Sequence, residues 1–156
     1  MRILFIAPFG TCHKQTVLRR MLPLAQGLAA RGHQVEALIP AWDCPAEAGR
    51  VMVQAGVTVR WPKRGPTLHP LSDLFLLWRA QRAARAFRPQ LVHAFKTFGY
   101  SGALTQWFQR QGGVVTVVDV DDLETVAGWG RGRPLLMRLA GGAQEAQTVR
   151  RAQGVT

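Results

Sequence analysis

Acidic residues are scarce in this chain of 156 residues: 9 Asp and Glu stand against 20 Lys and Arg, and the formal net charge is +11 at pH 7. Such an imbalance favours an anionic partner. The 47% hydrophobic and 19% charged content excludes a long disordered or collagen-like protein. We therefore expect one compact domain with a full core.

Long hydrophobic runs are also missing, because no stretch reaches the roughly 18 apolar residues that a membrane span requires. The apolar run at residues 3–7 ends at Pro8, is too short for the core of a signal peptide, and has no small-residue cleavage site behind it. Any contact with a membrane is therefore expected to be made from its surface.

The two cysteines, Cys12 and Cys44, are too few for a disulfide framework. They are typical of a reducing compartment, where each is predicted to be a small buried thiol, and a cytoplasmic location follows. Together with His13 they are also too few and too irregularly spaced for a zinc site, which needs four ligands. We expect no structural zinc site.

Strand and helix patterns alternate along the chain. Strands are predicted at residues 3–7, 34–39, 57–61, 91–95 and 114–118, and helices at 16–31, 71–87, 101–110 (capped by Ser101) and 134–152. Residues 42–56, which include Pro45 and Gly49, are predicted to be loop that can contain a helical turn. The alternation predicts an α/β fold with a Rossmann-like, three-layer parallel sheet, whose strand-to-helix loops share the edge where ligands bind.

The loop after the first strand, at residues 9–15, occupies the place where α/β proteins bind phosphates or sugars through backbone N–H groups. It lacks the second glycine beside Lys14 that a Walker loop requires, and no G-x-G-x-x-G follows the first strand. A dinucleotide site is therefore not expected. Gly10 and Lys14 remain candidate substrate-binding residues because of the position of the loop.

The fourth predicted strand brings His93 and Lys96 to the same edge, where an imidazole and an ammonium can hydrogen-bond a sugar or phosphate. A histidine in such a strand is more often part of the core and hydrogen-bonded to a carbonyl. Both interpretations remain open.

Carboxylates cluster at the end of the fifth predicted strand, at Asp119, Asp121 and Asp122. Clustered acids repel one another unless a cation or hydrogen-bond donors offset them. They can ligate a divalent ion, accept hydrogen bonds from acceptor hydroxyls, or cap the turn and pair with arginines. The last explanation is the default.

Cationic side chains recur every three residues on the helix predicted at 71–87, beside two aromatic ones: Arg79, Arg82, Arg85 and Arg88, with Phe75 and Trp78. Most such stripes are solvated faces. The functional alternatives are an anionic membrane surface or nucleic acid, but no helix-turn-helix, RNP-like or zinc-finger pattern is present. Nucleic acid is therefore the less favoured partner.

Four segments together carry a family resemblance: MRILFIAPFG, LAQGLAARGHQV, LVHAFKTFGYSG, and VVDVDDLE followed by GWG. They resemble the N-terminal half of GT-B glycosyltransferases of the retaining family-four type, and the resemblance covers nearly the whole chain. It implies two Rossmann-like domains facing a cleft. The first binds the acceptor and the second binds a nucleotide-sugar, which is a co-substrate and not a cofactor, and transfer needs no metal.

On this resemblance, residues 1–156 are expected to form a single acceptor-side domain, with the donor-binding domain absent and no activity without it. The partners implied are a nucleotide-sugar, a lipid-linked or cell-envelope glycan as acceptor, a chain that supplies the donor domain, and an anionic membrane at its inner face. A noncatalytic partner module of the same fold is the alternative, and a nucleic-acid binder is a weaker one, motivated by charge alone.

The resemblance also assigns residues. The Gly10 loop matches the family's cleft-facing loop, although Gln15 stands where relatives often have a small residue. Asp121 aligns with a histidine that touches the donor sugar, so its position, but not its chemistry, makes it the catalytic candidate. His93, Lys96, Asp119 and Asp122 are expected to line the cleft. The Asp-x-Asp spacing also resembles the metal motif of the other large glycosyltransferase fold, which leaves a metal as the minority interpretation.

Overall fold

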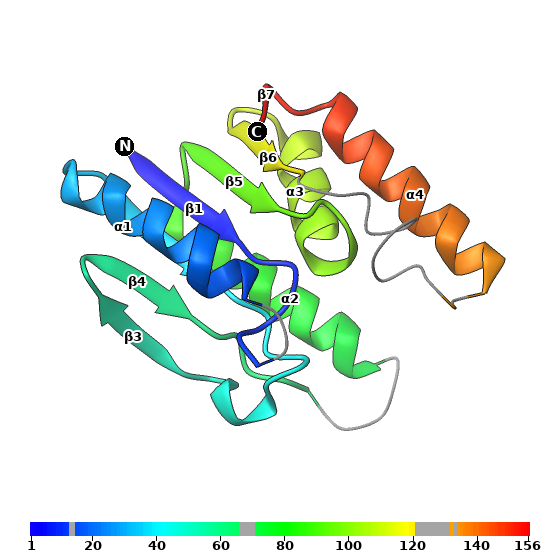
Figure 1. The fold of residues 1–156 in the computed structure, drawn as a ribbon, viewed down its shortest axis with the longest axis horizontal. Helices are drawn as coiled ribbons and strands as arrows, with labels where there is room; N and C mark the ends of the chain where they lie inside the picture. Colours follow the sequence, from blue (N-terminus) through cyan, green and yellow to red (C-terminus); the bar gives the residue numbers. More distant parts are fainter. Residues whose placement is uncertain (13–14, 66–70, 121–131, 133) are drawn as a thin grey trace.

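A seven-stranded sheet forms the centre of the molecule, in the order β3-β4-β2-β1-β5-β6-β7 (Figure 1). The structure is a computed structural model and describes residues 1–12, 15–65, 71–120, 132 and 134–156. All strand pairs are parallel except β3 and β4, which are antiparallel. The strands are β1 (Arg2–Ile6), β2 (Gln34–Leu38), β3 (Val51–Gln54), β4 (Val57–Arg60), β5 (Leu91–Phe95), β6 (Val115–Asp119) and β7 (Gly154–Val155).

Helices cover both faces of the sheet. They are the π-helix η1 (Val17–Met21), α1 (Leu22–Ala30), the short 3-10 helix η2 (Pro45–Glu47), α2 (Leu71–Phe87), α3 (Gly99–Gln111) and α4 (Leu135–Arg150). One core lies between the sheet and η1 with α1, and a second lies between the sheet and α2 with α3, while α4 packs beside α3. The predicted three-layer α/β architecture is confirmed.

The central strand β1 explains why the sheet is buried on both sides. Its side chains alternate between the two cores, with Phe5 in the first and Leu4 and Ile6 in the second, and all three are fully buried. A continuous apolar run is typical of a strand in a parallel sheet that helices cover on both faces. The outer strand β3, in contrast, has no buried residue.

The connections place a crevice beside β1. From β1 the chain crosses the η1 and α1 face to reach β2, whereas α2 brings it across the other face to β5, which pairs with the opposite side of β1. Apart from β3, this is the doubly wound strand order in which ligands bind outside the carboxyl ends of the strands, where the winding reverses. Here that point lies between β1 and β5.

Three expectations about local structure are wrong. The segment predicted as loop at residues 42–56 contains β3, and β7 adds a further strand, so the sheet has seven strands instead of five. Helix α3 begins at Gly99 with Phe98 as its N-cap, so Ser101 is not the cap. The Ser101 hydroxyl instead donates to the carbonyls of Lys96 and Phe98.

The cysteines also differ from expectation. Cys12 and Cys44 form a disulfide that joins the loop after β1 to the loop after β2, with their Cα atoms 5.6 Å apart. The prediction of two separate thiols is therefore wrong, and the inference of a reducing compartment loses its premise. The pairing depends on β1 and β2 lying side by side, which a separation of 32 residues does not reveal.

Among the described helices, none has the length and apolarity needed to cross a membrane.

Candidate functional site

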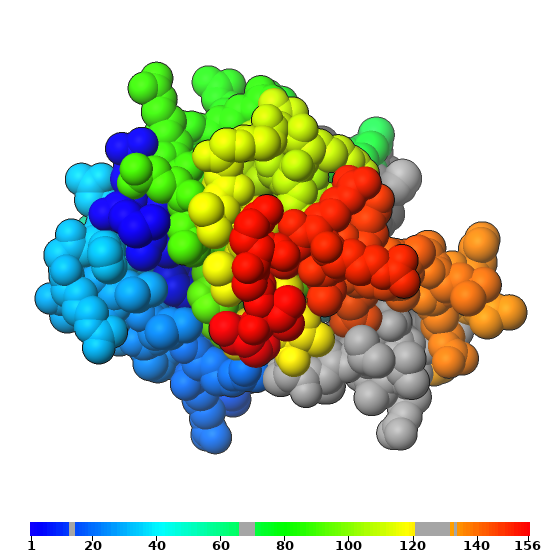
Figure 2. Space-filling model, turned by 90° about the horizontal axis from the view of Figure 1, so that it is seen from above, coloured from blue at the N-terminus to red at the C-terminus, as the bar shows by residue number. Residues whose placement is uncertain are grey.

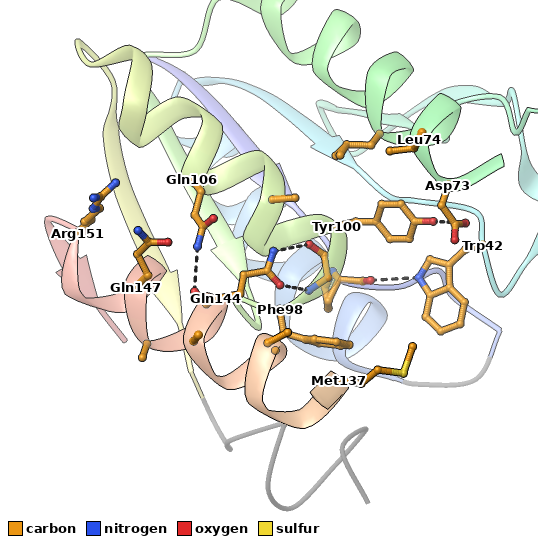
Figure 3. Close-up of a pocket in the computed structure, with 18 of the residues that line it drawn as sticks. Trp42, Asp73, Leu74, Phe98, Tyr100, Gln106, Met137, Gln144, Gln147 and Arg151 are labelled. Carbon is orange, nitrogen blue, oxygen red and sulfur yellow. Dashed lines mark hydrogen bonds between the residues drawn. The ribbon is translucent and has the colours of Figure 1, made fainter. Parts of the chain in front are cut away.

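A groove of about 1350 Å³ runs from the first turns of α2 and α3 along the length of α4 (Figure 3). Helix α2 follows β4, α3 follows β5 and α4 follows β6, so the N-terminal ends of all three lie at the carboxyl edge of the sheet. Pro8, from the loop after β1, and Trp42, from the loop after β2, complete the wall. The groove therefore opens at the edge where doubly wound sheets bind ligands.

One end of the groove is polar. The Tyr100 hydroxyl of α3 donates a 2.7 Å hydrogen bond to Oδ1 of Asp73, in the first turn of α2. Burial, reinforced by the hydrogen bond to Asp73, raises the pKa of Tyr100 above its usual value, so the hydroxyl stays protonated at neutral pH. Arg64 lies on the same wall. This end can accept a hydrogen bond from a ligand hydroxyl at Asp73 and present a cation to an anionic ligand.

An aromatic ring lies beside the polar end. Trp42 is 39% exposed, and its Nε1 donates to the Pro8 carbonyl at 3.1 Å, which fixes the indole between two loops. Figure 3 shows Trp42 next to Asp73 and Tyr100. An exposed indole held in this way offers an apolar face against which a sugar ring can pack.

The middle of the groove is apolar. Its walls come from all three helices and from the turn before α3: Leu74, Leu77, Phe98, Ala103, Met137, Ala140 and Ala143. The small residues of α4 leave room between α3 and α4. The groove can therefore hold an apolar portion of a ligand whose polar portion reaches Asp73.

Gln144 joins the two sides of the groove. Its side-chain amide accepts a hydrogen bond from the Gly99 N–H at 2.9 Å and donates to the Gly99 carbonyl at 3.2 Å. Gln106 of α3 in turn donates to the Gln144 carbonyl and to the Thr148 hydroxyl. This network holds α4 against α3 and so sets the width of the groove.

The Gly10 loop makes its hydrogen bonds to carboxylates. The Gly10 N–H donates to Oδ1 of Asp43 at 2.6 Å, and the Thr11 hydroxyl donates to Glu47 at 2.7 Å. A Cβ at Gly10 would lie 2.5 Å from the same Asp43 oxygen, so any other residue would have to displace this carboxylate. The Gly10 N–H is thus already engaged, and the neighbouring negative charges oppose the binding of phosphate at this loop.

His93 lies inside the first core. Its ring packs between Phe5 and Phe95, with centroid distances of 5.2 and 5.0 Å, and only 7% of the residue is exposed. Burial lowers the pKa of His93 to about 4, so the imidazole is neutral at pH 7. Its Nε2 is buried without a hydrogen-bond partner. The position is that of a core histidine, outside the groove.

Asp119 ends β6 on the same face of the sheet as His93. Both of its carboxylate oxygens lie 2.9 Å from Nη2 of Arg20 in η1. For Asp119, this ion pair supports the explanation in which the acids of the cluster pair with arginines. The Asp119 carbonyl also accepts the N–H of Lys96, a buried residue whose φ is +52°. Lys96 and Asp119 thus form a buried junction between the ends of β5 and β6.

The remaining candidates, Lys14, Asp121 and Asp122, lie outside the described residues, and their roles stay predictions. Of the candidates within the described part of the chain, Gly10, His93, Lys96 and Asp119, none lines the groove. That part also contains no group of three His, Cys, Asp or Glu residues arranged to hold a metal ion.

Comparison with known proteins decides the family. The profile of the family described as "Glycosyl transferase 4-like domain" matches residues 16–156. The chain belongs to this family. A search of curated proteins found no match.

A solved structure shares the fold of this chain. Sucrose-phosphate synthase from Thermosynechococcus elongatus is similar over 99% of this chain and 42% of its own, with a TM-score of 0.67 and 16% sequence identity. The glycosyltransferase SnogD from Streptomyces nogalater is similar over 100% of this chain and 43% of its own, with a TM-score of 0.47 and 22% identity. The resemblance to the N-terminal half of GT-B glycosyltransferases is confirmed for family and fold, and the chain spans less than half the length of either matched protein.

Sequence reasoning missed the residues that line the groove of this glycosyl transferase 4-like domain. Tyr100 is the one tyrosine in the sequence, and Asp73 is the one acid between Glu47 and Asp119. A lone carboxylate in a basic stretch, at the start of a helix that begins at the ligand edge, is the pattern that would have pointed to Asp73. Nothing local in the sequence indicates that Tyr100 contacts it.

Proposed function

We propose that residues 1–156 form the acceptor-binding side of a glycosyltransferase that moves a sugar from a nucleotide-sugar to a lipid-linked or cell-envelope glycan. The observation that carries the proposal is the groove at the carboxyl edge of the sheet, with Asp73 and Tyr100 at its polar end and an apolar middle. A glycan attached to a lipid has the same division between a polar and an apolar part.

Each side chain at the polar end has a task in this proposal. Asp73 accepts the hydrogen bond of the acceptor hydroxyl that will receive the sugar, and Tyr100 orients the Asp73 carboxylate. Trp42 packs against the face of the acceptor sugar. Positioning of this kind is a large part of catalysis, because it holds the hydroxyl ready for attack on the donor.

The chemistry itself needs a donor-binding domain in addition to these residues, whether joined to them or separate. Family membership supports a transfer that retains the anomeric configuration. Its oxocarbenium-like transition state and departing diphosphate would be stabilised by electrostatics from that domain. The +11 charge supports a location at an anionic membrane surface, where a phosphorylated lipid acceptor also resides.

The test mixes the protein with a donor-binding domain of a glycosyl transferase 4-like protein, a radiolabelled nucleotide-sugar and a glycolipid acceptor. We expect label to move to the glycolipid, and Asp73→Asn to reduce transfer at least tenfold. Gln111→Glu, at the exposed end of α3 and outside the groove, serves as the control with near-normal transfer. Absence of transfer with every donor domain tried, together with absence of glycolipid binding, would refute the proposal.

A noncatalytic interaction module is the second candidate, and one observation favours it. The N-terminal half of α4 exposes Leu135, Leu136 and Leu139 to 68%, 77% and 62%, and Figure 2 shows this part of α4, in orange, projecting beyond the rest of the molecule. Exposed apolar clusters of this kind mark interaction sites. The mass of the protein in solution, alone and with a donor domain, tests this candidate, and a monomer that stays alone contradicts it.

A further inference from the structure

A second cavity, of about 600 Å³, lies on the opposite flank of α2, between that helix and the β3–β4 hairpin. It shares no lining residue with the groove described above. Its α2 wall includes Trp78, Arg79 and Arg82, and its strand wall includes Val51 and Arg60. It is therefore separate from the proposed acceptor site.

Cations dominate this cavity. Its charged lining residues are Arg60, Lys63, Arg79, Arg82 and Glu36. Glu36, a buried residue, is paired with Arg60 at 2.9 Å, so this one acid of the cavity is already neutralised. Lys63, Arg79 and Arg82 have no carboxylate within ion-pair distance in the part of the chain that the structure describes. Three cations thus face one concave surface with no counter-ion among the described residues.

These cations are held in place by their neighbours. The Arg79 guanidinium lies 4.6 Å from the centre of the Phe75 ring, and that of Arg82 lies 5.8 Å from the centre of the Trp78 ring. The stem of Lys63 runs over Gly49, where an added Cβ would approach its Cγ to 2.9 Å. Moreover, Nε of Arg79 is buried and has no hydrogen-bond acceptor. A solvated stripe would have mobile side chains that water satisfies, whereas here a buried donor lacks an acceptor.

The rim of the cavity is apolar. Val51 and Trp78, which line the cavity, are 53% and 50% exposed. Val53, farther along the edge strand β3 on the same face of the sheet, is 71% exposed. A soluble phosphate would gain nothing from these side chains. Aliphatic residues and a tryptophan around a cationic centre suit the interface of a membrane, where the headgroup phosphate lies beside the acyl boundary.

We propose that the cavity between α2 and the β3–β4 hairpin binds the phosphate of an anionic phospholipid headgroup, with Lys63, Arg79 and Arg82 as its ligands and Trp78 and β3 against the acyl boundary. This inference assigns a location to the anionic membrane contact proposed above, and it rests on that contact. It does not depend on the acceptor groove, because lipid binding is measured without any sugar transfer.

The test is co-sedimentation of the protein with phosphatidylcholine vesicles, with and without phosphatidylglycerol. We expect binding only when phosphatidylglycerol is present, and R79Q/R82Q to weaken it about 25-fold, since each cation at an anionic surface contributes roughly fivefold. The control R19Q/R31Q removes the same charge from η1 and the end of α1, on the other face of the sheet, and should weaken binding less than threefold.

A second pair of variants adds charge without removing a contact. Ala86 is an exposed residue that lines the cavity, so Ala86→Glu places a carboxylate there and should abolish vesicle binding. Ala30 is exposed at the end of α1, and Ala30→Glu should leave vesicle binding intact. Equal losses in cavity and control variants would overturn the site and leave a diffuse membrane contact. No binding of the unaltered protein to phosphatidylglycerol vesicles would overturn both. Binding of soluble glycerol phosphate, blocked by R79Q/R82Q and without vesicle binding, would refute the lipid source.

Discussion

Gln144 of α4 binds both polar groups of the Gly99 backbone, at 2.9 and 3.2 Å, and so ties the start of α3 to the middle of α4. The two residues are 45 positions apart in the sequence. A side-chain amide is the one group that supplies a donor and an acceptor with the spacing of a peptide unit. The groove between α3 and α4 consequently has a fixed wall at this point.

Replacing Gln144 with Ala should therefore destabilise the protein by about 1–3 kcal/mol, because two backbone groups of Gly99 lose their partners. Urea unfolding measures the loss. Gln147→Ala is the matched control, since Gln147 is exposed on the same helix, and it should change the free energy of unfolding by less than about 0.5 kcal/mol. Equal effects of the two substitutions would show that the amide contributes nothing.

Tyr100 is the one tyrosine of the chain, so its ionisation can be followed alone by ultraviolet absorbance. Because burial and the hydrogen bond to Asp73 raise its pKa, we expect the titration midpoint above the ordinary value of about 10. The Asp73→Asn substitution removes the negative charge and should lower that midpoint. Tyr100→Phe has no tyrosine and should show no titration. A midpoint at the ordinary value would contradict the buried pair.

The same shift predicts how stability depends on alkaline pH. A raised pKa in the folded state means that the unfolded chain releases this proton first. The contribution of Tyr100 to stability is therefore complete below about pH 10 and is lost as the pH rises through the folded-state value. Tyr100→Phe should remove this alkaline loss.

Sequence patterns predicted helices and strands correctly where an element has a buried face and ends at a residue that breaks regular structure. The bounds predicted for α2 and β5 equal those of the structure, because Arg88-Pro89 separates them and both elements have apolar residues at the expected period. Strand β3 was missed because all four of its residues are exposed, and its turn uses Ala55 and Gly56, at φ +46° and +79°, instead of an Asn-Gly pair. An edge strand without a buried face has no periodicity to detect.

The candidate site was less predictable, for a physical reason. Sequence reasoning selected residues at strand ends, and of these Asp119 pairs with Arg20 while His93 packs in the core. The polar end of the groove is instead built from the first turns of α2 and α3, where Asp73 and Tyr100 come into contact through the packing of the two helices. A contact between side chains of two different helices depends on how the helices pack, and the spacing of residues in the sequence does not reveal that packing.

His93 makes a prediction for acidic pH. The unfolded chain binds a proton at this residue near pH 6.5, whereas the folded protein does so only near pH 4, so the unfolded state holds more protons between these values. Stability should fall as the pH falls through this window, by up to about 3 kcal/mol. His93→Leu should flatten this part of the profile, and His33→Leu, at the turn before β2, should leave it unchanged. A profile that His93→Leu does not alter would contradict the buried neutral imidazole.

The Cys12–Cys44 disulfide should stabilise the fold chiefly by restricting the unfolded chain. A bridge across 32 residues corresponds to about 3–4 kcal/mol in the chain-entropy estimate. Because the Gly10–Asp43 and Thr11–Glu47 hydrogen bonds join the same two loops, the reduced protein should keep its fold. Only its free energy of unfolding should decrease. Thermal unfolding with and without dithiothreitol measures the effect. The Cys12→Ser/Cys44→Ser variant should unfold at the temperature of the reduced protein and not respond to dithiothreitol. Two reactive thiols in the untreated native protein would show that the bridge does not form.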